Sequence, residues 1–117
     1  MSESQKSSTA ASMEMEITTR MVQLLAEIAG RGPTKAKTVI GPDYVLGIFR
    51  DIYTRQERTL ITKGHAAAVL ELRQRLQEVA RPAATQLIEE VTGRRVTAVT
   101  SAASVEADLS TWVFILE

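Results

Sequence analysis

The sequence predicts an α+β fold, a two-layer sandwich in which helices cover a four-stranded, mainly antiparallel sheet. Two observations predict it. Apolar residues recur at steps of three and four in two long segments, the period of an amphipathic helix, while four shorter segments are rich in Val, Ile and aromatic residues. The order is helix, two strands, helices, two strands. At 117 residues the chain has the length of one domain, expected over residues 12–117, after a polar, flexible N-terminal tail over residues 1–11.

The first helix is expected to begin at Ser12, a suitable N-cap, and to end where Gly30, Gly32 and Pro33 interrupt it. Its predicted buried stripe consists of apolar residues at helical spacing: Met13, Ile17, Met21, Leu24, Leu25 and Ile28.

A hairpin is expected next, with strands over residues 35–40 and 44–50 and a turn at Gly41-Pro42-Asp43. Two further strands are expected near the C-terminus, over residues 96–101 and 109–116, and the small, polar residues 102–108 connect them.

Between the two strand pairs, Thr54 and Glu57 have the spacing of a capping box and predict a short helix that ends near Gly64. A longer helix follows and stops at Gly93. Pro82 is expected to kink or break it, because proline lacks an amide donor and clashes with the preceding turn. The predicted buried stripe keeps helical spacing on both sides of this proline: Val69, Leu72, Leu76, Val79, Ala83, Leu87 and Val91.

Two strands are apolar on both faces. In the last strand Trp112 and Phe114 alternate with Val113 and Ile115, and Leu46 lies in a similar alternation in the hairpin. One layer of helices leaves one sheet face in water, and a wet face is normally polar. We therefore expect a second copy of the chain on that face, in a homodimer. The alternative is that the long helix splits at Pro82 and its halves cover both faces.

Composition narrows the functional classes. The 14 basic and 14 acidic residues give no net charge, so a general nucleic-acid binder is not expected. The absence of cysteine excludes thiol catalysis and cysteine-bound zinc, and His65, the single histidine, cannot build a multi-histidine metal site. We expect no catalytic residues, metal or cofactor. An enzyme would have only His65 and scattered carboxylates to use.

A candidate binding segment follows the first helix: Gly30, Arg31, Gly32, Pro33, Thr34 and Lys35. Two glycines can turn backbone amides toward an anion, although the spacing is not that of a nucleotide P-loop and a helix C-terminus presents carbonyls. The alternative is a helix cap followed by a turn. From Arg31 to Lys63 seven basic and three acidic residues give a local charge of +4, and the predicted basic face includes Lys37, Arg50, Arg55 and Arg58. The alternative is an ordinary solvated face.

This segment resembles the GRGP-[TS]-K signature of the MpsC-like family of small bacterial proteins, named after a component of a sodium-translocating, membrane-potential-generating system. The string from Leu87 to Gly93 and the C-terminal strand agree with it, so the resemblance spans about residues 13–117. Residues 62–65 depart from the family pattern, where a more acidic helix is expected.

The resemblance implies a non-enzymatic accessory or regulatory protein of a sodium-linked or bicarbonate transport system, in the cytoplasm or peripheral to the membrane. No stretch of this chain is apolar enough to span a membrane. The alternative is an anion-, nucleotide- or nucleic-acid-binding module that uses residues 30–35 and the basic segment.

Overall fold

The computed structural model describes residues 2–117, with side chains from residue 9 on, and confirms the α+β class. Seven elements follow one another in the predicted order: α1 (Ser2–Ala29), β1 (Lys35–Ile40), β2 (Tyr44–Arg50), α2 (Arg55–Thr62), α3 (Ala66–Thr92), β3 (Val96–Ser104) and β4 (Leu109–Leu116).

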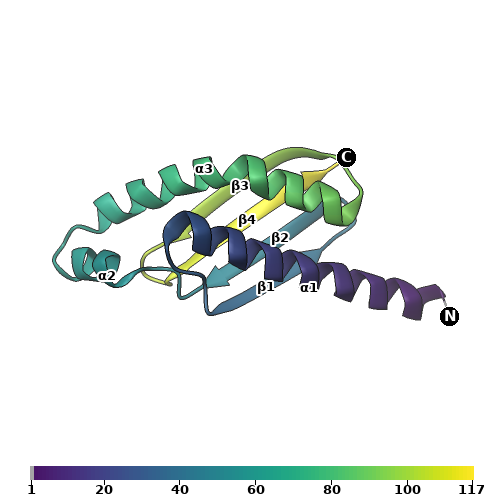
Figure 1. The fold of residues 1–117 in the computed structure, drawn as a ribbon, viewed down its shortest axis with the longest axis horizontal. Helices are drawn as coiled ribbons and strands as arrows, with labels where there is room; N and C mark the ends of the chain where they lie inside the picture. Colours follow the sequence, from purple (N-terminus) through teal and green to yellow (C-terminus); the bar gives the residue numbers. More distant parts are fainter. Residues whose placement is uncertain (1) are drawn as a thin grey trace.

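The four strands form one antiparallel sheet in the order β1-β2-β4-β3 (Figure 1). The predicted hairpin of β1 and β2 is present, and the two predicted C-terminal strands pair with each other, β3 being longer than predicted because it continues to Ser104. The strands β2 and β4 pair at the centre, with Gly47 opposite Trp112. The β1–β2 hairpin and the C-terminal pair of strands are thereby held side by side. This pairing brings the turn after β3 next to the end of β2, which matters for the candidate site below.

The helices α1 and α3 lie together on one face of the sheet (Figure 1). An ion pair at 2.7 Å between Arg20 of α1 and Glu90 of α3 joins them. The core lies between this layer and the sheet, and its fully buried larger side chains come from both: Ile17, Met21, Val45, Phe49, Tyr53, Val69, Ile88, Trp112 and Phe114.

The first helix begins earlier than predicted. It runs from Ser2, so Ser12 lies inside the helix and is not its N-cap. The predicted flexibility of residues 1–11 stays a prediction; Met1 and the side chains of residues 2–8 lie outside the described residues.

The helix α3 is continuous from Ala66 to Thr92, with Pro82 in its interior. Of the two predicted outcomes, the break at Pro82 is therefore wrong, while no measured angle tests the kink. The alternative in which two half-helices cover both faces of the sheet is also wrong. Pro82 itself is exposed, on the side of α3 that faces away from the core. Gly93 ends the helix as predicted, in the left-handed conformation at φ 69°.

The buried face of α3 differs from the predicted stripe. Leu72 and Val79 are 46% and 65% exposed, and Ala83 is exposed as well. The residues that face the sheet include two polar ones: Val69, Arg73, Gln77, Ala80, Ala84, Leu87 and Ile88. The prediction failed because periodicity assumes that polar residues face water, whereas Arg73 and Gln77 find polar partners inside the fold.

The opposite face of the sheet is not covered by any helix of the described chain. In β2 and β4 the side chains that alternate with the buried ones are mainly apolar: Tyr44, Leu46, Ile48, Leu109, Val113 and Ile115. We call these six residues the open sheet face. Ile115 is 39% exposed and the other five are half-buried against one another. The sequence correctly predicted that this second face is apolar. The second copy of the chain expected to cover it stays a prediction.

Candidate functional site

The GRGPTK segment connects α1 to β1. Gly30 ends α1 at a positive φ of 78°, and its amide donates to the Ala26 carbonyl at 2.9 Å. Pro33 is buried, and the Thr34 amide donates to the Arg50 carbonyl at 3.2 Å, which starts the pairing of β1 with β2. The two expected roles of a helix cap and a turn are therefore both present here.

Asp51, directly after β2, receives the polar side chains of this segment. Its Oδ2 accepts from Arg31 Nη2 at 2.6 Å and from the Thr34 hydroxyl at 2.8 Å. Its Oδ1 accepts from Arg58 of α2. Arg31 also donates through Nε to the Asp51 carbonyl at 3.2 Å. The Arg31 guanidinium and the Thr34 hydroxyl, which were expected to bind an external anion, thus bind the carboxylate of Asp51.

Asp108 adds the turn between β3 and β4 to the same network. Its Oδ1 accepts from the Ile52 amide at 2.9 Å, its Oδ2 lies 3.3 Å from Arg58 Nη2, and its carbonyl accepts from the Asp51 amide at 2.9 Å. Both aspartates have positive φ, 59° at Asp51 and 50° at Asp108, a conformation that Asp tolerates better than most residues. We call Arg31, Thr34, Asp51, Arg58 and Asp108 the Asp51 hub.

The hub favours the ionised form of its central carboxylate. The hydrogen bond from Thr34, those from Arg58, and the positive charges of Arg31 and Arg58 together lower the pKa of Asp51. Two arginines face two aspartates, so the charges of the hub balance. What the arrangement does chemically is to hold three connections of the chain together.

A second polar cluster lies behind the hub, in the interior. Arg73 of α3 donates to Glu57 of α2 through Nε at 2.8 Å and Nη2 at 2.6 Å, and also to the Ile52 carbonyl. Glu57 completes the predicted capping box, accepting from the Thr54 amide at 2.7 Å. Burial opposes the charge of Glu57, but the hydrogen bonds from Arg73 and Thr54 outweigh it and lower the pKa of Glu57. The Arg73 guanidinium also lies 5.2 Å from the ring centre of Tyr53, which stabilises the buried cation further.

The predicted basic face divides into two parts. Lys35 and Lys37 are exposed on the edge strand β1, and Arg50 is exposed at the end of β2, where it is paired in register with Lys35. The ion pairs among the described residues include none of these three cations. Arg55 is exposed on α2, whereas Arg58 belongs to the hub. The GRGPTK segment is divided too, since Lys35 lies on the sheet while Arg31 and Thr34 contact Asp51.

His65 is exposed at the N-cap position of α3, where its side chain makes no capping hydrogen bond. In the part of the chain that the structure describes, no group of three His, Asp or Glu residues is arranged to hold a metal ion. No helix among the described residues is both long and apolar enough to cross a bilayer.

Sequence reasoning missed the acceptors of this site. Asp51, Asp108 and Glu57 are ordinary acidic residues in the sequence, 57 positions apart at most, and only the strand order brings them together. Arg73 was missed because its neighbours Leu72 and Leu76 suggested the wrong buried face. The one local signal was the capping box, which fixes the direction of Glu57 but not its arginine partner.

Fold and site define a small α+β domain with one helical layer, one uncovered sheet face and a charge-balanced hub at the glycine segment of residues 30–35. Residues 9–117 match the family model described as Na+-translocating membrane potential-generating system (MpsC). The chain belongs to the MpsC family, as its GRGPTK segment suggested. Comparison with curated proteins and with solved structures found no significant match.

Proposed function

We propose that this protein is a non-enzymatic accessory or regulatory subunit that docks on the cytoplasmic side of a sodium-linked transport system. The observation that carries the proposal is the family match over residues 9–117, whose name refers to a Na+-translocating, membrane-potential-generating system. In this proposal a partner supplies the membrane-spanning part, since no helix of the described residues is long and apolar enough to cross a bilayer.

The hub supports a binding rather than a catalytic role. A general base or nucleophile needs a free lone pair or thiolate within reach of a substrate. The carboxylate oxygens of Asp51 and Glu57 instead accept hydrogen bonds from Arg31, Arg58 and Arg73. Such a site stabilises the arrangement of the connections that meet at it.

The open sheet face supplies the docking surface in this proposal. Leu46 and Val113 are cross-strand partners at its centre. Of the three unpaired cations, Lys35 and Lys37 lie on the edge strand β1 and Arg50 lies at the end of the adjacent strand β2. We assign the apolar centre to a second copy of the chain in a homodimer. The basic edge then remains available for an acidic partner surface or for anionic lipid headgroups of the membrane.

Membrane vesicles from the native host test the function. Deletion of the gene is expected to lower the Na+-dependent membrane potential, measured with a voltage-sensitive dye, and the purified protein should restore it. A Lys35→Ala/Lys37→Ala/Arg50→Ala variant should restore it less, because the basic edge is lost. Arg81→Ala/Arg95→Ala, which removes exposed cations elsewhere, is the control. An unchanged potential after the deletion would exclude the proposal.

The second candidate function is an anion-, nucleotide- or nucleic-acid-binding module, favoured by the shallow depression that Lys35, Lys37 and Arg50 line. Salt-dependent retention on heparin, lost in Lys35→Ala but kept in Arg81→Ala, is the expected result for it. Arg31→Ala adds a second comparison, since Arg31 is already bound to Asp51 and its loss should change stability more than retention. Elution in the void volume at low salt would dispose of this candidate.

A further inference from the structure

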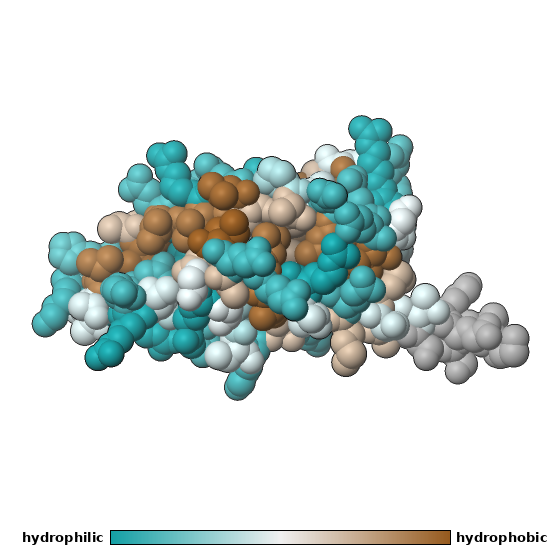
Figure 2. Space-filling view, viewed as in Figure 1, coloured by the Kyte–Doolittle hydropathy of each residue, from teal (hydrophilic) through white to brown (hydrophobic). Residues whose placement is uncertain are grey.

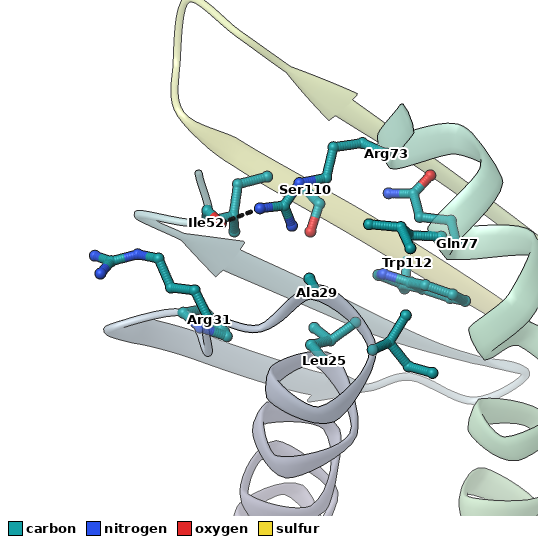
Figure 3. Close-up of a pocket in the computed structure, with 11 residues that line it drawn as sticks. Leu25, Ala29, Arg31, Ile52, Arg73, Gln77, Ser110 and Trp112 are labelled. Carbon is teal, nitrogen blue, oxygen red and sulfur yellow. Dashed lines mark hydrogen bonds between the residues drawn. The ribbon is translucent and has the colours of Figure 1, made fainter. Parts of the chain in front are cut away.

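A cavity of about 20 Å³ lies between α1 and α3 above β4. Its walls are mainly aliphatic and come from both helices and from the segments that lead into and out of the sheet: Leu25, Ile28, Ala29, Pro33, Ile52 and Leu76. Three polar side chains, Arg73, Gln77 and Ser110, face it beside Trp112 (Figure 3).

Trp112 brings an unused donor to this cavity. The residue is fully buried, and its indole Nε1 has no hydrogen-bond partner within the described residues. In Figure 3 the nitrogen-bearing edge of the ring points into the space beside Ser110 and Ala29. A buried N–H without an acceptor is unfavourable, and each such group in a native protein calls for an explanation.

Arg73 brings a second donor. Its Nε and Nη2 are bonded to Glu57 and to the Ile52 carbonyl, and no hydrogen bond of the described residues uses Nη1. Figure 3 shows the guanidinium reaching over the cavity next to Ser110. Gln77 is held by a hydrogen bond from its Nε2 to the Ala102 carbonyl at 3.3 Å. An acceptor oxygen in the cavity therefore meets the free indole N–H of Trp112, and the Arg73 guanidinium lines the same cavity.

The charges around the cavity are already balanced. Glu57 neutralises Arg73, and Asp51 neutralises Arg31, whose guanidinium points away from the cavity in Figure 3. A carboxylate buried here would bring an uncompensated negative charge, which is costly away from water. A neutral acceptor, such as a carbonyl or amide oxygen, fits the donors without that cost.

The rim of the cavity continues the apolar surface outward. Leu76 lines the cavity, and its neighbours on α3, Leu72 and Val79, are the exposed residues that the sequence placed in the core. Figure 2 shows hydrophobic residues gathered over the middle of the helical layer. In this part of α3 the polar Arg73 and Gln77 are buried and the apolar Leu72 and Val79 are exposed, which is the reverse of the usual pattern of a surface helix.

We propose that the cavity and its apolar rim on α3 bind a neutral amphipathic molecule with an aliphatic chain and one carbonyl or amide oxygen. The oxygen enters the cavity and accepts from Trp112 Nε1 and Arg73 Nη1. The aliphatic chain lies along the rim, over Leu76, Leu72 and Val79. The inference does not depend on the proposed transport function. Its competitor is a single bound water, because a cavity of about 20 Å³ has room for one.

Trp112 is the only tryptophan of the chain, so its indole N–H gives one assigned signal in a ¹H–¹⁵N spectrum. Titration with hexanamide is expected to move this signal downfield and to saturate. Hexylammonium, which has the same chain and no acceptor, should leave it in place, and hexanoate should bind at least about tenfold more weakly because of its charge.

Two variants locate the effect. Ala29→Leu fills the cavity from its wall and is expected to weaken hexanamide binding at least about tenfold, the loss expected when an apolar site is filled. Ala68→Leu adds the same volume at an exposed position of α3 and should bind hexanamide as the natural protein does.

An indole signal that hexanamide leaves unchanged up to its solubility limit would overturn the proposal, and a cross-relaxation signal to a bound water would then identify water as the occupant. Hexanoate binding as tight as hexanamide binding would overturn the neutral class of ligand. The titration of the natural protein decides the proposal by itself, so the conclusion holds even if Ala29→Leu folds poorly.

Discussion

Glu57 is a carboxylate that serves two neighbours, since it caps α2 and neutralises the buried Arg73. The side chains of the pair are only 5% and 9% exposed, so each charge depends on the other for stabilisation. Removing one member of such a pair leaves the second uncompensated in a poorly hydrated environment.

The change Glu57→Gln is therefore expected to lower the free energy of unfolding by about 3 kcal/mol. Glutamine retains the capping acceptor, so the loss reports the missing charge and not a broken helix start. Urea denaturation measures it, with Glu78→Gln at an exposed position of α3 as the control, expected within about 0.5 kcal/mol of the natural protein. Equal effects of the two changes would contradict the role given to the pair.

Asp51 makes stability depend on pH. Because its pKa is lowered in the folded state, the unfolded chain binds more protons in the acid range. The stabilisation is complete above the ordinary carboxyl pKa of about 4 and is lost as the pH falls through the folded pKa. Glu57, with its lowered pKa, acts in the same direction.

Asp51→Asn is expected to be less stable than the natural protein at pH 7, and the difference should narrow as the pH falls below about 4. Asparagine tolerates the positive φ of this position, so the backbone is kept. Denaturation series across this pH range measure the narrowing. Asp43→Asn, in the exposed hairpin turn, is the control. A difference that stays constant with pH would show that the charge of Asp51 contributes nothing.

Among the elements, α3 deviates most from sequence expectation. It continues through Pro82, and Ala80 and Ala84 on either side of the proline are both fully buried against the sheet. The proline remains unfavourable within the helix, since it removes the hydrogen bond to residue 78 and crowds that turn.

Pro82→Ala is expected to raise the free energy of unfolding by about 1–3 kcal/mol, because alanine restores the missing hydrogen bond and Pro82 has no buried contacts to lose. Thermal and urea denaturation measure the gain. Arg81→Ala, also exposed and adjacent, is expected to change stability by no more than about 0.5 kcal/mol. A lower stability of Pro82→Ala would mean that a bend at this position is needed for the packing of α3.

For the whole molecule, the two-layer arrangement leaves the second sheet face in water. Leu46 and Val113 form the centre of this face, and the nearest described cations lie at its β1 edge. A two-fold axis parallel to the strands would place the β1 edge of one copy over the β3 edge of its partner and keep Lys35 and Lys37 of the two copies apart.

Sedimentation equilibrium at micromolar concentration is expected to give twice the chain mass of 12.8 kDa. Leu46→Lys/Val113→Lys should give the mass of one chain, because buried lysines would oppose the apolar contact. Leu72→Lys/Val79→Lys on the helical layer should stay dimeric and serves as the control. A single-chain mass for the natural protein would exclude the homodimer.

Local rules were reliable where the interaction is local. The capping box at Thr54, the turn at residues 41–43 and the left-handed cap at Gly93 all formed as predicted, since each depends on a few neighbouring residues. The face of α3 could not be predicted, because whether Arg73 faces water or protein depends on Glu57, 16 positions away. The contacts of the candidate site could not be predicted for the same reason. The donors Arg31 and Thr34 could be recognised in the sequence, whereas their acceptor Asp51 could not.

The sequence by itself determined the elements, their order, the fold class and the apolar second face of the sheet, because periodicity and turn chemistry act over short stretches of chain. Only the tertiary structure decided that Asp51 takes the donors of the GRGPTK segment, that Leu72 and Val79 lie outside, and that Trp112 keeps an unused N–H. These three features depend on contacts between segments that the strand order brings together, and no local pattern records such contacts.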